Sequence, residues 1–450
     1  MTDLAKRDQR TLWHPFTQMS EWRDGRPVVI ERGEGNYLID TEGNRYFDGV
    51  SSLWVNLYGH DHPRIRTAIH EQLDRLAHST LLGLASRPSI ELAERLIELA
   101  PPGLKRVFFS DNGSTAVEVA LKMAFQFWQQ KGDPAGRERT RFVALKDAYH
   151  GDTLGALSAG GIETFHEIFR PLVFDMLRAE NAYCYRCPYG LHHPECNIHC
   201  LESLDGILER HGHEVAAVIV EPLVQAAAGM RLLPHGWLRR VRELCNRHGT
   251  LLIVDEVATG FGRTGRMFAC EHEGVSPDLM AIAKGITAGF LPLAATLATE
   301  EIFNGFLGPV HDNRQFFHGH SYTGNTLGCA AALASLDVFE AERVLDRVRE
   351  VSVYLAHRLE ALRQLPTVGD IRQLGLMVGI ELVRNRETKE PFPPGEQVGA
   401  QVCMAIRKYG VILRPLGDTV VLMPPLSARR EEIDHLIDAL SKCIAQVTGE

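Results

Sequence analysis

The chain has 450 residues, of which 45% are hydrophobic and 23% charged, and its formal net charge at pH 7 is -9. This length and composition predict a folded protein of about two or three domains and exclude an intrinsically disordered chain. The acidic balance argues against a protein that coats nucleic acid or binds an anionic membrane surface. No apolar run is long enough to span a bilayer, and residues 1–16 lack the features of a signal peptide, so we expect a cytoplasmic protein.

Residues 1–80 are predicted to form an N-terminal arm and part of a small domain. The arm contains WHPFTQM, in which the pair His14-Pro15 favours extended or turn backbone. This segment either lines a pocket or packs as a simple tail. The alternating pattern of RPVVIERGEGNYLIDTEGNRYFDGV predicts a small β-meander, and an amphipathic helix is expected after Pro63.

Residues 81–335 are predicted to form a large α/β domain with a mostly parallel sheet, because strand patterns alternate with helical ones. The expected strands include RVFFS, TRFVALKDAY, EVAAVIVEP, LLIVDE, LMAIAK and PLAATLAT. Residues 336–450 are predicted to form a C-terminal α+β domain that ends in an amphipathic helix.

Two of these strand patterns end in ionisable residues. LLIVDE ends in Asp255 and Glu256, and LMAIAK ends in Lys284. Open α/β folds bind ligands at the carboxyl ends of their strands, so an acid and a lysine would meet there. A lysine beside an apolar wall loses its proton more readily and becomes a nucleophile towards aldehydes. A salt-bridged pair or a snorkelling lysine is the alternative, although the glycines after Lys284 favour access to a ligand.

A second candidate site follows the strand that ends at Ser110. The sequence DNGSTAVEVALKMA contains a turn signal and a helix start, for which Thr115 and Glu118 predict a capping box. The free N–H groups and the dipole of a helix N-terminus favour a phosphate. Gly113, Ser114 and Thr115 are therefore candidate phosphate ligands, although helix starts of this kind are common.

Other candidate residues also lie next to strands. KDAYHGDT places Tyr149 after a strand, where its ring either stacks on a flat cofactor or caps the surface. Glu221 ends VIVEP and is either a site acid or a solvated strand end. Ser321 precedes a helix of small residues, which again suits a phosphate. Arg414, in GVILRPLG, either binds a carboxylate or forms a buried structural ion pair.

The sequence GFGRTG (260–265) matches the pattern G-x-G-x-x-G, so a nicotinamide-dependent enzyme is an alternative. That fingerprint requires its glycines directly between a strand and a helix, with an acid about 20 residues later. Here Asp255 and Glu256 intervene, no apolar helix follows Gly265, and the next strand ends in Lys284. We therefore reject dinucleotide binding.

The cysteines fall into two groups. Scattered ones are expected to be buried apolar fillers: Cys245, Cys270, Cys329, Cys403 and Cys443. The others cluster as C-x2-C and C-x3-C, a pattern typical of zinc or iron–sulfur sites: Cys184, Cys187, Cys196 and Cys200. Reduced surface thiols or a disulfide-closed loop are the alternatives, and we expect no metal. A non-enzymatic metal-binding protein is the corresponding rival function.

Several of these motifs together resemble the class-III aminotransferases, which are fold-type-I pyridoxal-phosphate enzymes: IVDEVATGFGRTG, the AKG lysine, the DNGS loop, AYHGDT and HGHSYTGN. The resemblance covers nearly the whole chain. It implies a large domain with a mostly parallel seven-stranded sheet, a small α+β domain made by both termini, and pyridoxal 5'-phosphate as cofactor. It also implies a homodimer with active sites at the subunit interface, and amino transfer between small-molecule substrates.

The resemblance further implies roles for individual residues. Lys284 would bind the cofactor covalently, Asp255 would contact the pyridine nitrogen, and Tyr149 would stack on the ring. Further cofactor contacts are expected from Gly113, Ser114, Thr115, Glu221, Val257 and Ser321, the last contributed by a neighbouring subunit. Substrate contacts are expected from Phe16, Trp54, Tyr149, Gly319 and Arg414.

Three segments narrow the resemblance to a branch of the family that aminates a keto acid: WHPFTQM, DGVSSLW and RPLGD. Many members of this branch have tyrosine in place of Phe16 and tryptophan in place of Leu53. Both differences resemble members that use L-lysine rather than S-adenosylmethionine, so the amino donor stays open between the two. Another ω-amino-acid transaminase, of the 4-aminobutyrate or ornithine type, is the alternative function.

Overall fold

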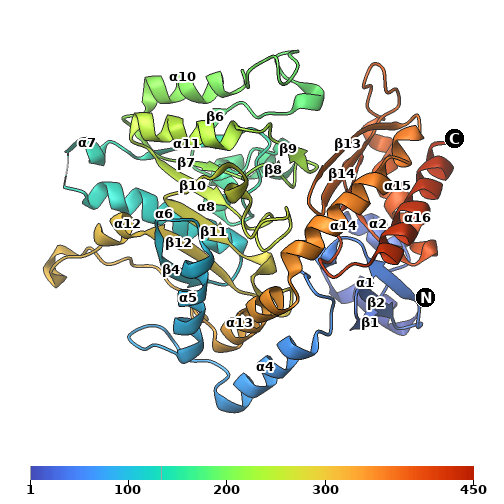
Figure 1. Cartoon of the computed structure of the whole chain (residues 1–450), viewed down its shortest axis with the longest axis horizontal. Helices are drawn as coiled ribbons and strands as arrows, with labels where there is room; N and C mark the ends of the chain where they lie inside the picture. Colours follow the sequence, from blue (N-terminus) through green and yellow to red (C-terminus); the bar gives the residue numbers. More distant parts are fainter. Residues whose placement is uncertain (1, 133, 450) are drawn as a thin grey trace.

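A seven-stranded sheet forms the centre of the larger part of the molecule (Figure 1), in a computed structural model that describes residues 2–132 and 134–449. The strand order is β4-β12-β11-β10-β7-β5-β6, and only β12 runs antiparallel to its neighbours. Its strands are β4 (Leu104–Ser110), β5 (Arg141–Leu145), β6 (Leu177–Ala179), β7 (Val215–Val220), β10 (Leu251–Asp255), β11 (Leu279–Ile282) and β12 (Ala294–Thr299). The mostly parallel seven-stranded sheet that the resemblance implied is thus confirmed.

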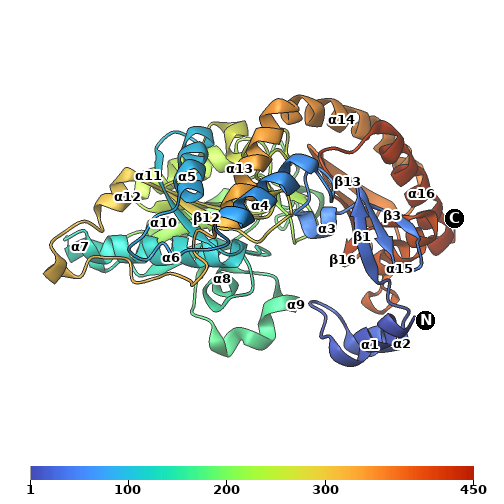
Figure 2. The ribbon, with the colours of Figure 1, turned by 90° about the horizontal axis from the view of Figure 1, so that it is seen from below.

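Helices cover both faces of this sheet because its strands are apolar on both sides. β7 is buried at every residue, which is why its sequence VAAVIV shows no polar alternation. Helix α6 (Gly113–Gln130) packs on β7, β10, β11 and β12, whereas α11 (Trp237–His248) packs on β10. Figure 2 shows α6 and α8 (Leu154–Ala159) on one side of the sheet, with α5 (Arg87–Leu99), α11 and α13 (Thr326–Ala341) on the other.

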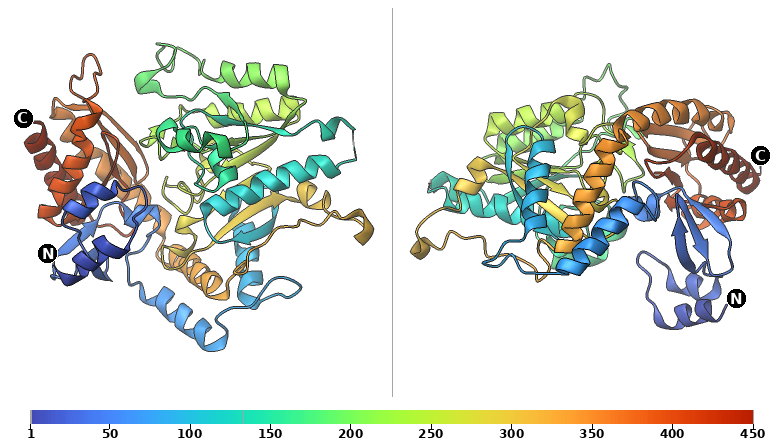
Figure 3. Two further views of the ribbon diagram at one scale, coloured as in Figure 1. Left: turned by 180° about the vertical axis from the view of Figure 1, so that it is seen from behind. Right: turned by 60° about the horizontal axis from the view of Figure 1, so that its bottom comes forward.

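The smaller part of the molecule combines both ends of the chain (Figure 3). The expected β-meander is confirmed, and its last strand pairs in parallel with β15 through Phe47 and Val411. This sheet contains β1 (Ile30–Glu34), β2 (Tyr37–Asp40), β3 (Arg45–Asp48) and β15 (Val411–Ile412). A second sheet contains β13 (Val368–Leu374), β14 (Met377–Leu382), β17 (Thr419–Leu422) and β16 (Arg414–Leu416).

The other helices frame these sheets. The C-terminal ones are α14 (Val344–Leu359), α15 (Val398–Ala405) and α16 (Arg430–Thr448). The N-terminal ones are α1 (Asp3–Thr11), α2 (Met19–Asp24), α3 (Ser51–Trp54) and α4 (Pro63–Arg75). The short elements of the larger part are α7 (Pro134–Arg137), α9 (Glu163–His166), α10 (Leu201–His211), α12 (Glu300–Asn304), β8 (Val224–Gln225) and β9 (Arg231–Leu232). None of the described helices has both the length and the apolar character needed to cross a membrane.

The predicted capping box at the start of α6 is wrong in its register. Asn112, not Thr115, is the N-cap residue, and its side chain accepts a hydrogen bond from the Thr115 N–H. Thr115 is the third residue of the helix, and its hydroxyl accepts from the Asn112 N–H to complete the box. Glu118 instead accepts hydrogen bonds from the N–H groups of Gly155 and Ala156, which tie α8 to α6. Asparagine is as good an N-cap residue as threonine, so capping preference alone cannot decide which of the two begins the helix.

Candidate active site

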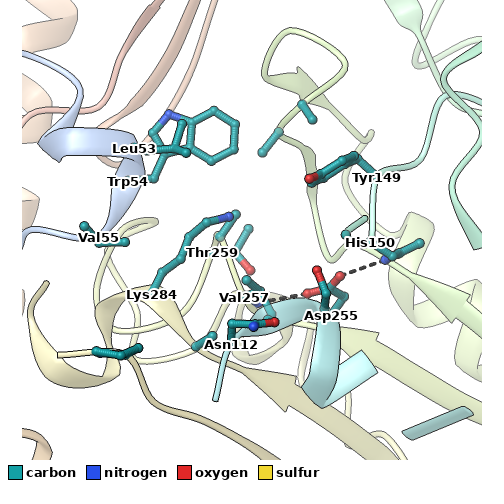
Figure 4. A pocket seen from close by; sticks show the side chains of 18 of the residues that line it. Leu53, Trp54, Val55, Asn112, Tyr149, His150, Asp255, Val257, Thr259 and Lys284 are labelled. Atoms are coloured by element: carbon teal, nitrogen blue, oxygen red, sulfur yellow. Dashed lines mark hydrogen bonds and ion pairs between the residues drawn. The ribbon is translucent and has the colours of Figure 1, made fainter. Parts of the chain in front are cut away.

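A cavity of 740 Å³ opens at the carboxyl ends of the parallel strands, where the sequence placed its acid and its lysine. Asp255 is the last residue of β10, and Lys284 follows β11 after one residue. Tyr149 and Glu221 follow β5 and β7. Figure 4 shows that the side chains of Asp255, Lys284 and Tyr149 approach the cavity from different elements, with the indole ring of Trp54 above Lys284 and across from Tyr149.

Asp255 is held by two groups on its own chain. Its Oδ2 lies 2.7 Å from Nδ1 of His150, and its Oδ1 accepts a hydrogen bond of 3.0 Å from the Val257 N–H (Figure 4). Both the histidine and the aspartate are buried. The carboxylate therefore has a fixed orientation, which is what a partner for a ring nitrogen requires. The sequence singled out Tyr149 in the AYHGDT motif but gave no sign that its neighbour His150 would contact Asp255.

Lys284 occupies an environment that favours its neutral amine. Its backbone has a φ of 44°, in the left-handed region, and its Nζ lies 4.8 Å from the centre of the Trp54 ring. Burial lowers the pKa of Lys284, and the carboxylates of Asp255 and Glu221 only partly oppose this shift. An amine with a lowered pKa is the nucleophile that the sequence predicted.

Glu221 supports the site through the backbone. It accepts hydrogen bonds from the N–H groups of Tyr149 and Ala226, at 3.1 and 2.9 Å. Burial raises the pKa of Glu221 to about 7, with a smaller contribution from Asp255 in the same direction. Tyr149 in turn donates its hydroxyl hydrogen to Asp152 at 2.8 Å, so that its ring is fixed at both ends. Glu221 is therefore more than a solvated strand end.

The start of α6 forms another wall of the cavity. Gly113 and Ser114 line it, whereas Thr115 does not, since both its N–H and its hydroxyl serve the helix cap. A Cβ atom on Gly113 would lie 2.6 Å from Cγ1 of Val257, so only glycine allows the helix to approach the loop after β10 this closely. The predicted cofactor residues Gly113, Val257 and Asp255 are thus brought together.

Two predicted substrate residues, Phe16 and Arg414, do not line the cavity itself, but aromatic contacts connect them to Tyr149 in its wall. The guanidinium of Arg414, at the start of β16, lies 5.8 Å from the centre of the Phe16 ring. Phe16 contacts Phe165 edge to face at 5.4 Å, and Phe165 contacts Tyr149 at 6.3 Å. Burial lowers the pKa of Arg414, and the described residues give it no hydrogen bond or ion pair. An unpaired cation of this kind argues against the structural ion pair considered above.

Two other predicted residues do not reach the cavity of their own chain. Gly319 and Ser321 lie in an exposed segment before α13, and the Ser321 carbonyl accepts a hydrogen bond from His78 at 2.8 Å. Phe317 and Tyr322 of the same segment are 70% and 62% exposed, which leaves a large aromatic surface open to solvent.

Helix α3 is a turn that sequence reasoning did not foresee. Its residues Ser51, Ser52, Leu53 and Trp54 have φ values of 50°, 56°, 101° and 71°. Left-handed backbone costs about 1–2 kcal/mol per residue for side chains with a Cβ atom. The turn brings Leu53 and Trp54 into the cavity wall. No sequence signal marks it, because left-handed turns normally carry glycine or asparagine.

The cysteine cluster lies away from this cavity. Cys184 is exposed, the other three thiols are half-buried, and all four line a small separate hollow: Cys184, Cys187, Cys196 and Cys200. No disulfide links them. Within the described parts of the chain, no three histidine, cysteine or acidic side chains are arranged to hold a metal ion. The five scattered cysteines are buried, as predicted.

Known proteins share both the sequence and the fold. Residues 18–444 match the family model "Aminotransferase class-III". A relative from Geobacter sulfurreducens, named adenosylmethionine-8-amino-7-oxononanoate aminotransferase, is 55% identical over 98% of this chain and 97% of its own. The crystal structure of the enzyme of that name from Methanocaldococcus jannaschii superimposes with a TM-score of 0.93 at 45% identity, over 98% of each chain.

An amine transaminase from an uncultivated Pseudomonas species, solved in its PLP-bound form, also has this fold. It is 37% identical, with a TM-score of 0.91 over 97% of this chain and 98% of its own. Both the α/β architecture and the family expected from the sequence are confirmed. The chain belongs to the class-III aminotransferases, enzymes of the fold-type-I group.

Proposed function

We propose that this aminotransferase converts 8-amino-7-oxononanoate to 7,8-diaminononanoate in biotin synthesis, with pyridoxal 5'-phosphate as cofactor. The names of the relatives support the reaction, as does the resemblance of WHPFTQM, DGVSSLW and RPLGD to 8-amino-7-oxononanoate aminotransferases. The observation that carries the proposal is a cavity that contains Lys284 and Asp255, with the unpaired cation Arg414 connected to its wall at Tyr149 through Phe16 and Phe165.

The cavity fits pyridoxal phosphate in its chemistry. The amine of Lys284 suits the cofactor aldehyde, and the fixed carboxylate of Asp255 suits the pyridinium nitrogen. The Tyr149 ring suits stacking on the pyridine face. The N-terminus of α6, with Gly113 and Ser114, suits a phosphate. Bound pyridoxal phosphate supplies an electron sink for the carbon that loses a proton.

The protein's own residues would then control protons and charge. Asp255, held by His150 and the Val257 N–H, would keep a proton on the ring nitrogen. Lys284 would hold the cofactor and, once freed by the substrate, carry a proton to and from the reacting carbon. Its lowered pKa suits this role, since a general base works best when its pKa lies near the working pH.

Substrate specificity would come from residues in the wall of the cavity and next to it. Arg414 would bind the carboxylate of the keto substrate, because a guanidinium binds a carboxylate through two parallel hydrogen bonds. Phe16, beside Arg414, would cover the aliphatic chain, and Trp54 would form the opposite wall. Gly319 does not reach the cavity of its own chain, so it would act from a neighbouring subunit, where the open space on its Cβ side would leave room for the substrate.

We also propose that the enzyme is a homodimer in which each subunit contributes Ser321 to the other subunit's phosphate site, while Thr115 acts only through the helix that it caps. The exposed Phe317 and Tyr322 beside Ser321, with Leu82 90% exposed in the adjacent segment, support an interface there. Exposed aromatic and leucine side chains gathered on one face are typical of protein interfaces.

The decisive assay is amination of 8-amino-7-oxononanoate with L-lysine and S-adenosylmethionine offered separately. The names of the relatives favour adenosylmethionine, whereas Phe16 and Leu53 resemble the branch that uses lysine. Formation of 7,8-diaminononanoate with either donor supports the proposal and identifies the donor. Turnover of 4-aminobutyrate or ornithine, without turnover of the keto substrate, would contradict it in favour of an ω-amino-acid transaminase.

A further inference from the structure

The left-handed turn α3 holds an unfavourable backbone at the wall of the cavity. Four successive residues with side chains, Ser51 to Trp54, have φ values between 50° and 101°. A conformation of this kind persists only where its surroundings fix it. Its two largest side chains, Leu53 and Trp54, line the cavity, and the Trp54 ring lies 4.8 Å from Lys284 Nζ (Figure 4).

Asp48, at the end of β3, holds the first half of the turn. Its carboxylate is fully buried. Oδ1 accepts a hydrogen bond of 2.9 Å from the Ser52 N–H, and Oδ2 accepts one of 2.7 Å from the Ser52 hydroxyl. His60 Nε2 lies 3.2 Å from Oδ2 on the other side. The carboxylate thus joins the turn to the end of the β-meander.

Arg263 holds the second half of the turn from the larger part of the molecule. It belongs to the GFGRTG loop, and its side chain is 1% exposed. One NH2 group donates hydrogen bonds to the carbonyls of Trp54 and Asn56, at 3.4 and 2.7 Å. The other donates to the Pro424 carbonyl at 2.7 Å. No described carboxylate lies within ion-pair distance of this buried guanidinium. Burying a charge without an ion-pair partner is costly, so the hydrogen bonds to the three carbonyls have to compensate for that cost.

The loop that carries Lys284 packs directly against the end of the turn. A Cβ atom on Gly289 would lie 3.1 Å from the backbone nitrogen of Asn56, so the two backbones touch. A shift of the turn would therefore move both Trp54 and the backbone near Lys284.

We propose that Asp48 and Arg263 are positioning residues that hold residues 51–54 in their left-handed turn and so place Leu53 and Trp54 over Lys284. The effect on substrates rests on the proposed function, because it requires that this cavity bind them. The effect on the turn does not, since it concerns the protein alone. GFGRTG, which resembles a dinucleotide fingerprint, thus has a different role: its arginine fixes the wall of the active site.

Hydrogen–deuterium exchange of the full-length protein, with and without added pyridoxal phosphate, tests the turn. The N–H groups of residues 53–56 donate to the carbonyls of Val50 and Ser51 and should exchange slowly. Asp48→Ala should speed their exchange by about tenfold or more, because the turn then opens locally. Asp48→Asn, which keeps one acceptor for Ser52, should have a smaller effect. The matched control is Asp40→Ala, which removes another buried carboxylate of the same sheet without touching the turn.

Arg263→Lys gives the same test if Asp48→Ala does not fold, because the single nitrogen of lysine cannot occupy both positions from which the two guanidinium NH2 groups reach these carbonyls. Unchanged exchange at residues 53–56 in either variant, or equal acceleration in Asp40→Ala, overturns the proposal.

A second substitution separates positioning from general damage. Glycine adopts left-handed backbone without penalty, so Ser52→Gly in the Asp48→Ala background should restore slow exchange and at least part of kcat/KM. Loss of kcat/KM in Asp48→Ala without recovery in the double variant would contradict the role of the turn. If the wild-type protein fails to aminate the keto substrate, the proposed function fails, while the exchange data still decide the role of Asp48.

Discussion

Nδ1 of His150 lies 2.7 Å from Oδ2 of Asp255, and the two side chains are only 3% and 6% exposed. The remaining ring nitrogen of the histidine has no hydrogen-bond partner among the described residues. The contact of the His150 imidazole with Asp255 therefore orients the Asp255 carboxylate, which faces the cavity. This pair connects the ends of β5 and β10, which are separated in the sheet by β7.

Replacing His150 with alanine should lower kcat and weaken cofactor binding. A hydrogen bond to a charged group contributes about 1.5–3 kcal/mol, so we expect a decrease of about 10- to 100-fold. Steady-state kinetics and cofactor titration measure the effect. His272→Ala, which removes a half-buried imidazole whose hydrogen-bond partner among the described residues is Thr264, is the matched control. Normal kcat in His150→Ala would show that the contact has no part in catalysis.

The lowered pKa of Lys284 should make the stability of the cofactor-free protein depend on pH. Between its lowered value and the ordinary 10.5, the unfolded chain binds more protons than the folded one, so stability rises with pH. Lys284→Met should therefore raise Tm at neutral pH, and the gain should shrink as the pH approaches 10.5. Thermal unfolding of both proteins, with exposed Lys105→Met as control, measures this. A gain that does not vary with pH would contradict the lowered pKa of Lys284.

Replacing Arg414 with alanine should raise KM for the keto substrate far more than it lowers kcat. Loss of a charge-assisted contact to a carboxylate corresponds to about 10- to 100-fold in affinity. The methyl ester of the same substrate provides the control, because it lacks the negative charge and should show nearly equal KM values in both proteins. An equal increase for acid and ester would assign Arg414 a structural role.

Aromatic substitutions at the cavity wall should change the choice of amino donor. Phe16→Tyr combined with Leu53→Trp adds a hydroxyl and a large ring near the cavity. An added ring attracts the sulfonium and adenine of S-adenosylmethionine, by about 0.5–2 kcal/mol. The ratio of kcat/KM for S-adenosylmethionine to that for L-lysine should therefore rise several-fold. An unchanged ratio would show that other residues choose the donor.

Much of the larger part could be predicted from the sequence because its strands are continuous apolar runs. VAAVIV and LLIVD have few alternatives to a buried strand, and the acid and lysine that follow such strands lie at one edge of the sheet. The antiparallel direction of β12 could not be predicted, since AATLAT carries no sign of direction. The elements from α8 to α10 could not be predicted either, because the cysteines, prolines and glycines of this segment leave no clear periodicity.

The parts of the site that the sequence missed depend on contacts between distant segments. His150 contacts Asp255 across 105 residues of chain, and Arg263 holds Asn56 across 207. Local pattern contains no information on such contacts. The left-handed turn was missed for a different reason: its residues have ordinary side chains, and the fixing groups come from β3 and from the GFGRTG loop.

If pyridoxal phosphate binds in this cavity, Lys284 holds it covalently. Purified protein loaded with pyridoxal phosphate should be reduced with borohydride, digested and mapped by mass spectrometry. We expect one phosphopyridoxyl group on Lys284, and none on this peptide in Lys284→Ala, which should remain folded but inactive. A label fixed on another lysine, or full turnover by Lys284→Ala, would contradict it.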